Sequence, residues 1–236
     1  MSILAIEKPM VSFKGAYFSK DVILYAVFFY VRFGVSYRNL EAIMVERGVK
    51  VDHSTLNRWV INYSSSLALA AKKIKRAVAT SWRMDETTIK VKGEWVFLYR
   101  AVDKFGDAVD FMLSERRDEA AATAFFKHAI DANGFPNKVV MDKGGANFAG
   151  IENISMLLML AGLIDFVEKL QVKYLNNLVE QDHRFIKKIT NPMMGFKAFH
   201  SAKATLDGIE TAHMIRKGQL SDENLPAYKQ FMALAG

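Results

Sequence analysis

The sequence predicts an all-helical N-terminal segment followed by a mixed α/β sheet flanked by helices. Apolar residues recur at helical spacing over about 19–65, and they alternate with polar residues from position 82. After about residue 118, helical patterns alternate with short strand patterns. Antiparallel strands, a helix, and then strands alternating with helices are typical of a mixed sheet rather than a helical bundle or a β-sandwich.

The composition favours an anionic partner and excludes cysteine chemistry. The 236 residues carry a formal charge of +7, which favours nucleic acid first and a membrane surface second. The alternative is that the charge only aids solubility. The chain has no Cys, so disulfides, thiolate catalysis and cysteine-based metal sites are excluded, in keeping with a reducing cytoplasm.

Three short helices are predicted near the N-terminus, over residues 19–33, 36–47 and 54–65. Each begins at a Ser or Asp that can cap a helix, and Gly34 and Gly48 end the first two. Two helices joined by a short Gly-containing turn, after a first packing helix, form the helix-turn-helix pattern. The alternative is a plain three-helix bundle with a solvated face.

The third helix would read DNA with its outward side chains. The candidates for base or phosphate contacts are Thr55, Asn57, Arg58 and Asn62. Residues 66–80 are Ala-rich and basic and predict a linker helix, in which Lys72 and Lys73 are candidate phosphate contacts. A solvated charged face explains this segment equally well.

The sheet is predicted from three hairpin-connected strands at 82–91, 94–103 and 108–115. A helix over 118–132 follows, then strands at 138–142 and 170–174 and a helix over 176–189. The most apolar stretch, 154–164, is too short to cross a membrane and predicts a buried helix.

Three acids occupy unusual places in this arrangement. Asp85 lies inside the first strand, where a half-buried carboxylate needs a partner. Asp142 closes a later strand, although a turn or cap role explains it as well. Glu180 lies on the last predicted helix of the sheet. Three converging carboxylates repel one another unless a cation neutralises them, and ligation by oxygen alone suits Mg²⁺ or Mn²⁺.

A helical wheel places Glu180 on a polar face of its helix. Arg184, Lys187 and the imidazole of His183 fall on the same side, and a normal solvated face is the alternative. The opposite side is apolar, with Leu178, Phe185, Ile186 and Ile189. Asp182 falls on that apolar side, which predicts a buried Lys or Arg partner.

Several segments carry a resemblance to a known family. They are SYRNLEAIMVERGVKVDHSTLNRWV (36–60), WRMDETTIKVKGEWVFLYRAVD (82–103), MDKGGAN (141–147) and, most specific, YLNNLVEQDHRFIKK (174–188). In these segments the chain resembles the DDE transposases of bacterial insertion sequences, most closely the group typified by insertion-sequence family six. The interval from Asp142 to Glu180 is slightly longer than is usual for this group, with the extra length within 152–170.

The resemblance implies a domain order and a catalytic set. Residues 1–65 would be a helix-turn-helix domain, 66–80 a linker helix, 81–218 a ribonuclease-H-like catalytic domain, and 219–236 a C-terminal tail. The family's acid triad falls on Asp85, Asp142 and Glu180, which would hold two Mg²⁺ or Mn²⁺ ions. Its helix-borne basic residue falls on Lys187, and Arg184 could also grip phosphate.

The implied activity is cleavage at transposon ends and joining of the freed 3′-hydroxyl to target DNA, with cointegrate formation. The implied partners are double-stranded DNA, as terminal inverted repeats and as target, and a second copy or more in a synaptic complex. No membrane is expected, and the protein is expected in the bacterial cytoplasm with the nucleoid. Two alternatives stay open: a catalytically decayed DNA-binding protein, and a nuclease that hydrolyses without joining.

Overall fold

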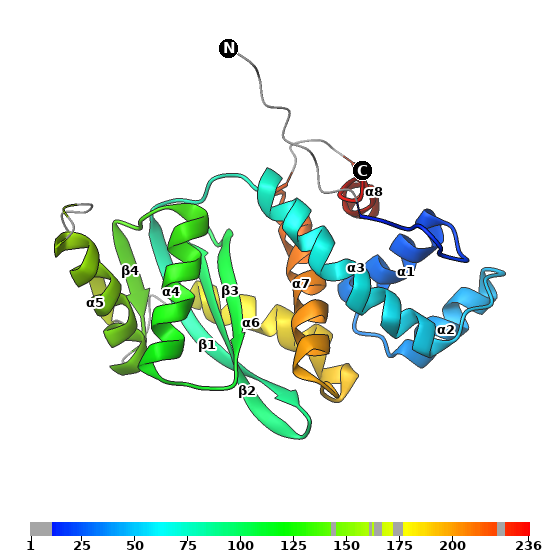
Figure 1. Ribbon diagram of the computed structural model, residues 1–236, viewed down its shortest axis with the longest axis horizontal. Helices are drawn as coiled ribbons and strands as arrows, with labels where there is room; N and C mark the ends of the chain where they lie inside the picture. Colours follow the sequence, from blue (N-terminus) through cyan, green and yellow to red (C-terminus); the bar gives the residue numbers. More distant parts are fainter. Residues whose placement is uncertain (1–10, 143–144, 161, 163–166, 172–176, 221–224) are drawn as a thin grey trace, which may run out of the picture. The chain divides into compact units, whose positions relative to one another are not determined.

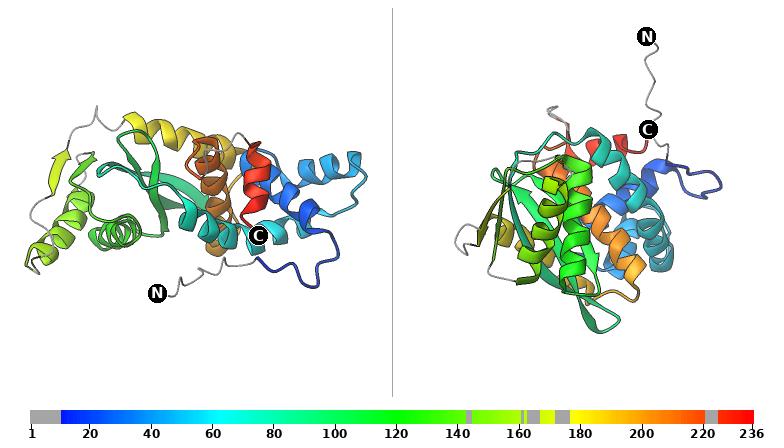
Figure 2. Two further views of the ribbon diagram at one scale, coloured as in Figure 1. Left: turned by 90° about the horizontal axis from the view of Figure 1, so that it is seen from above. Right: turned by 60° about the vertical axis from the view of Figure 1, so that its left-hand side comes forward.

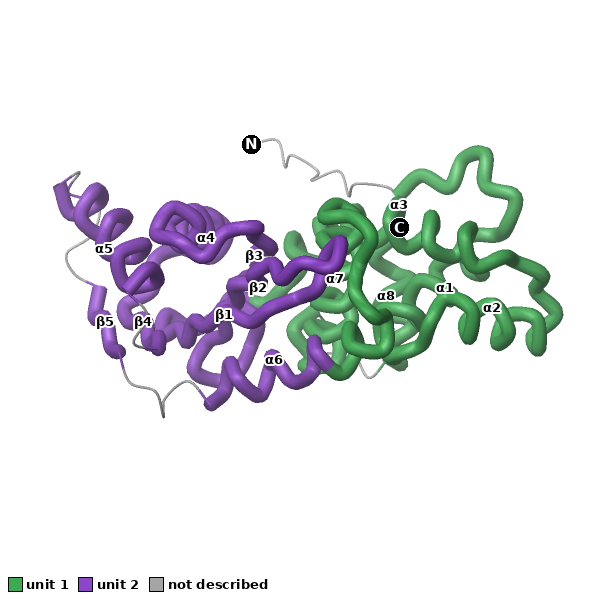
Figure 3. Tube along the Cα trace, turned by 90° about the horizontal axis from the view of Figure 1, so that it is seen from below, with its two compact units in different colours: residues 1–76, 188–236 green, residues 77–187 purple. Residues whose placement is uncertain are grey.

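The structure is a computed structural model that describes residues 11–142, 145–160, 162, 167–171, 177–220 and 225–236 (Figure 1). The chain divides into two compact units (Figure 3). Unit 1 comprises Met1–Arg76 and Lys188–Gly236, and unit 2 comprises Ala77–Lys187.

Unit 2 is built on a five-stranded mixed sheet with the order β3-β2-β1-β4-β5. The strands are β1 (Ser81–Val91), β2 (Glu94–Asp103), β3 (Ala108–Ser114), β4 (Lys138–Met141) and β5 (Glu168–Gln171). The first three strands are antiparallel neighbours, and β4 runs parallel to both β1 and β5. This order and these directions confirm the predicted ribonuclease-H-like mixed sheet.

Helices cover both faces of the sheet, as Figure 2 shows. One face carries α4 (Glu119–Asn133) and α5 (Gly145–Leu160), and the other carries α6 (Asn177–Thr190). An apolar core cluster lies under α4 and α5, with Trp82, Met84, Val139 and Met141 from the strands and Phe125, Phe126 and Ile151 from the helices. Alternate residues of β1 therefore point to opposite helical layers.

The described part of unit 1 is built mainly of helices. It contains α1 (Lys20–Arg32), α2 (Tyr37–Glu46), α3 (His53–Ile74), α7 (Phe199–Arg216) and α8 (Ala227–Ala233). Helix α7 packs against α1 and α3, and α8 packs against α1 and α7. A Cβ at Gly208 would lie 2.7 Å from Val31 Cγ1 and 2.8 Å from Ser64 Oγ, so glycine allows α7 to approach both helices closely.

The structure differs from the predicted domain order in three places. No separate linker helix exists over 66–80, because Leu67, Ala68 and Ala71 continue the buried face of α3 to Ile74. The region assigned to the end of the catalytic domain, α7, clusters with unit 1 instead. The C-terminal segment is part of the same helical core: Phe231 is fully buried, and its ring lies 5.3 Å from that of Phe28.

The apolar stretch at 154–164 is helical as far as Leu160, but the prediction that it is buried is wrong for four of the described residues after Ser155. Met156, Leu157, Met159 and Leu160 are 48–77% exposed. A helix turns once per 3.6 residues, and α5 buries only one face, through Ile151 and Ile154. A continuous run of apolar residues covers all faces of a helix, so some of these apolar side chains are exposed to solvent. The predicted strand at 170–174 starts earlier, at Glu168, and 172–174 lie outside the described residues. No helix among the described residues is long and apolar enough to cross a membrane.

Candidate active site

Asp85 lies in β1, and Asp142 directly follows β4, the parallel neighbour of β1. The register pairs Met84 of β1 with Met141 of β4, so the two acids occupy the next position along each strand. Met84 and Met141 both point into the core under α4 and α5. Because side chains alternate along a strand, Asp85 is placed on the opposite face, the one covered by α6, and we expect the same alternation to direct Asp142 there.

Helix α6 meets Asp85 through a histidine. His183 Nε2 lies 3.3 Å from Asp85 Oδ2, and the two side chains are 8% and 21% exposed. Glu180 lies one turn earlier, in the first turn of α6, and is exposed. Lys187, seven residues after Glu180, is also exposed and lies about 10 Å further along nearly the same stripe of the helix.

A buried ion pair joins α6 to the sheet. Arg100, which is opposite Asp85 in the β1–β2 register, places its Nη2 2.8 Å from Asp182 Oδ2. The two side chains are only 2% and 8% exposed. The predicted buried partner of Asp182 is thus Arg100. The helical-wheel prediction was wrong for two other residues, since His183 is buried and Leu178 is 37% exposed.

Glu86, next to Asp85, points to the other layer and anchors a second network. Its Oε1 accepts from Arg117 Nε at 2.6 Å, and its Oε2 accepts from Asn147 Nδ2 at 2.6 Å. Asn147 is 3% exposed and lies in the first turn of α5, just after the segment that carries Asp142. The negative charge of Glu86 is therefore compensated by the guanidinium of Arg117 and the amide of Asn147. Sequence reasoning did not assign this role to Glu86 or Asn147, although both lie in the motifs that carry the resemblance.

The donor chemistry of the acids fits a hard divalent cation, because Asp85, Asp142 and Glu180 offer only carboxylate oxygens. Asp85 and Asp142 directly follow the last registered pair of two parallel strands, and Glu180 lies on the helix that contacts Asp85. Among the described residues, no three His, Asp or Glu side chains are grouped closely enough to hold a metal ion. Residues 143–144 and 172–176, which adjoin Asp142 and α6, lie outside this description.

The start of α3 is rigidly capped. Asp52 accepts from the backbone N–H groups of Ser54 and Thr55 and from both hydroxyls, and these hydrogen bonds hold the pKa of Asp52 well below its usual range. His53 of the same turn pairs with Glu41 of α2 at 3.0 Å. The turn between α2 and α3 is thus fixed from both helices.

The candidate DNA-contacting side chains differ in their exposure and in their hydrogen bonds. Asn57, Arg58 and Asn62 are exposed on α3. The Thr55 hydroxyl is instead held between Asp52 and Arg58, whose Nη2 donates to it at 3.0 Å. Of the basic candidates outside this surface, Lys73 and Arg184 are exposed and Lys72 is half-buried.

Comparison with known proteins agrees with this fold. A family model described as a DDE domain matches residues 79–219. The chain is 40% identical over 205 residues to the transposase for insertion sequence-like element IS431mec of Staphylococcus aureus (strain N315). It is 39% identical over 205 residues to the transposase for insertion sequence element IS257 in transposon Tn4003 of Staphylococcus aureus. Each alignment covers 87% of this chain and 88% of the relative.

Among solved structures, the simian T-cell lymphotropic virus intasome in complex with PP2A regulatory subunit B56 gamma matches with a TM-score of 0.45 and 17% identity, over 64% of this chain and 58% of the other. The catalytic core domain of HTLV-2 integrase in complex with magnesium (dimeric form) matches with a TM-score of 0.43 and 20% identity, over 66% and 99%.

The strand order and the matched DDE domain define a transposase of the DDE class. With relatives at 40% identity over most of both chains, the protein belongs to the transposases of insertion-sequence family six.

Proposed function

We propose that the protein binds the terminal inverted repeats of its element, cleaves the ends, and joins the freed 3′-hydroxyls to target DNA. The observation that supports the proposal is the register of β1 and β4, whose last pair, Met84 and Met141, directly precedes Asp85 and Asp142, together with the helix that bears Glu180 on one face of this sheet. Joining leaves the element attached at both ends to target strands, which replication converts to a cointegrate.

In this proposal Asp85, Asp142 and Glu180 hold two Mg²⁺ or Mn²⁺ ions. When bound, such ions activate the attacking oxygen and stabilise the departing oxygen of a phosphodiester. Lys187, exposed on the same stripe of α6 as Glu180, binds a phosphate of the end DNA. His183 contacts one Asp85 oxygen and restricts the orientation of that carboxylate.

The DNA contacts are assigned to α3, with Asn57, Arg58 and Asn62 reaching base edges or phosphates and Lys73 reaching phosphate. The positive net charge supports binding to both end and target DNA. Because two ends must react together, the active form is a dimer or larger assembly, and it acts in the bacterial cytoplasm with the nucleoid.

Strand joining by the purified protein tests this function. The full chain is incubated with pre-cut end DNA, Mg²⁺ and a plasmid target, and joined product is scored. Joined product that requires Mg²⁺ and the element's own ends is expected. Sequence-specific end binding with no cleavage or joining in any divalent metal would instead support the decayed DNA-binding protein, and hydrolysis without joining would support a nuclease.

Replacing Arg58 with Ala is expected to weaken end binding about ten-fold at moderate salt, because a single arginine contact to a base or phosphate is lost. Fluorescence anisotropy with end-repeat duplexes at several salt concentrations measures the change. Arg116→Ala removes an equally exposed arginine from unit 2 and serves as the control. If the Arg58→Ala variant and the parent protein bind end-repeat duplexes with equal affinity, α3 does not recognise the end DNA.

A swap at Glu86 and Asn147 tests the network beside the acids. Asn147→Asp places a second carboxylate against Glu86, and this repulsion is expected to lower strand joining about 10- to 100-fold. Adding Glu86→Gln restores a donor–acceptor pair and is expected to recover most of the loss. The Mg²⁺ concentration for half-maximal joining should rise in the Asn147→Asp variant and return to the value of the parent protein in the double variant. A double variant as poor as the single one would show that the hydrogen bond does not position the Asp142 segment.

A further inference from the structure

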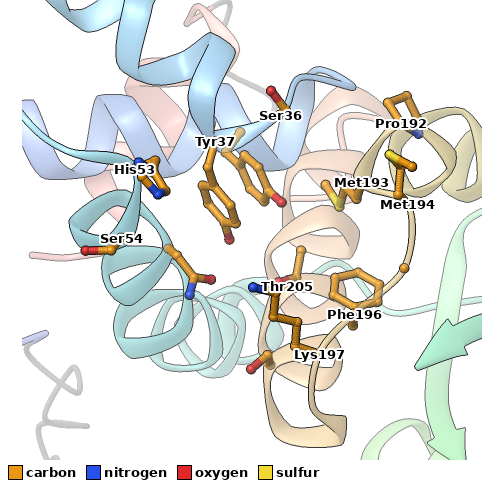
Figure 4. A pocket seen from close by; sticks show the side chains of 14 residues that line it. Ser36, Tyr37, His53, Ser54, Pro192, Met193, Met194, Phe196, Lys197 and Thr205 are labelled. Atoms are coloured by element: carbon orange, nitrogen blue, oxygen red, sulfur yellow. The ribbon is translucent and has the colours of Figure 1, made fainter. Parts of the chain in front are cut away.

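A cavity of about 410 Å³ lies within unit 1, between the start of α3 and the segment that follows α6 (Figure 4). One wall comes from the N-terminal ends of α2 and α3, with Ser36, Tyr37, His53, Ser54 and Asn57. The other wall is residues 192–197, and α7 contributes Ser201 and Thr205. The volume is at the small end of the range for ligand sites, and it suits one nucleotide rather than a duplex.

The lining has the charge character of an anion site. None of its residues is an Asp or Glu, and Lys197 is exposed at its edge. Tyr30 and Tyr37 stay neutral, because burial raises the pKa of Tyr30 to about 12 and raises that of Tyr37 further. The imidazole of His53 is already paired with Glu41, outside the lining, so Lys197 supplies the free positive charge.

Three lining side chains, one on α3 and two in the 192–197 segment, have no polar or ring partner among the described residues. They are the ammonium of Lys197, the amide of Asn57 and the ring of Phe196. The other aromatic wall is occupied, since the Tyr37 ring stacks on Tyr30 at 3.9 Å and its hydroxyl bonds to Thr205. Cations bind the phosphate of a nucleotide, amides hydrogen-bond to the edge of its base, and aromatic rings stack on the plane of the base.

We propose that this cavity receives one unstacked nucleotide of the end DNA, with its base against Phe196 and its phosphate at Lys197. The inference rests on the proposed end binding and extends it. Asn57 belongs both to the cavity and to the exposed surface of α3, so a strand that contacts this helix passes the mouth of the cavity. Met194, which is 90% exposed at the rim, would be covered by the bound strand.

End duplexes that carry 2-aminopurine at one position each test this inference with the full chain. Fluorescence of this base rises when it leaves the stack, so one position is expected to brighten on binding. Phe196→Ala and the milder Phe196→Leu are expected to remove the rise and to weaken binding about ten-fold for Ala and less for Leu. Lys197→Gln is expected to weaken binding and to lower the salt slope by about one.

Phe105→Ala and Lys229→Gln are matched controls, since both side chains are exposed and lie outside the cavity. Circular dichroism and urea midpoints show whether the variants fold. Normal end binding with no brightened position, or with Phe196 variants that brighten like the parent, overturns the inference and leaves end binding intact. A parent protein that binds end repeats no better than unrelated duplex overturns the proposed end binding and this inference together.

Discussion

Asp85→Asn, Asp142→Asn and Glu180→Gln are each expected to lower end cleavage and strand joining by about three orders of magnitude or more. Each change removes a negative ligand oxygen where the proposed cations stabilise charge that develops in the transition state, and losses of this size follow from deleting one such group. End binding should change little, because it is assigned to α3. Gel assays of cleavage and joining, with anisotropy for binding, measure both.

Asp131→Asn is the control, since this acid is exposed on α4, away from the α6 side of the sheet. The Asn and Gln variants keep the size of the parent side chains, so folding should persist. Loss of end binding in parallel with activity would mean that the acids are structural. Full activity in any one variant would remove that residue from the catalytic set.

Breaking the buried Arg100–Asp182 pair is expected to cost about 3–5 kcal/mol of stability. Arg100→Met removes the cation that lies 2.8 Å from the buried carboxylate of Asp182. Asp182 belongs to α6, the helix that also bears Glu180. The double variant Arg100→Met with Asp182→Leu is expected to be more stable than the single one, because both charges leave the interior. Urea unfolding followed by circular dichroism compares the variants.

The exposed pair between Lys138 and Glu168 provides the matched control. Its atoms lie 3.2 Å apart, but the side chains are 33% and 48% exposed, so Glu168→Gln should cost no more than about 1 kcal/mol. The single Arg100 variant should also lose strand joining, since α6 is no longer held. An Arg100→Met protein as stable as the parent would show that this pair does not anchor α6.

The periodic parts of the fold were predictable from sequence because each of their patterns is local. The hairpin strands and the helices around Glu180 and residues 118–132 lie within about two residues of the expected bounds. Asp182 was predictable as a buried acid for the same reason, since a helical wheel places it among apolar side chains.

The placement of α7 and α8 depended on long-range packing that no local pattern encodes. An apolar face requires a partner but does not specify which one, so α7 and Phe231 could not be assigned to the N-terminal helices. His183 was misplaced because its angle on the wheel lies within the polar face, whereas its ring lies 3.3 Å from Asp85 of β1, a contact that a wheel of one helix does not include. The same limit applies to Glu86, whose partners Arg117 and Asn147 come from distant segments.

Anomalous diffraction from crystals of the full chain with pre-cut end DNA and Mn²⁺ tests most directly whether Asp85, Asp142 and Glu180 share divalent cations. Manganese peaks are expected about 2.1 Å from carboxylate oxygens of these residues, beside the terminal phosphodiester. Crystals with end DNA bound but with manganese located elsewhere, or held by none of the three acids, would contradict the proposed catalytic site.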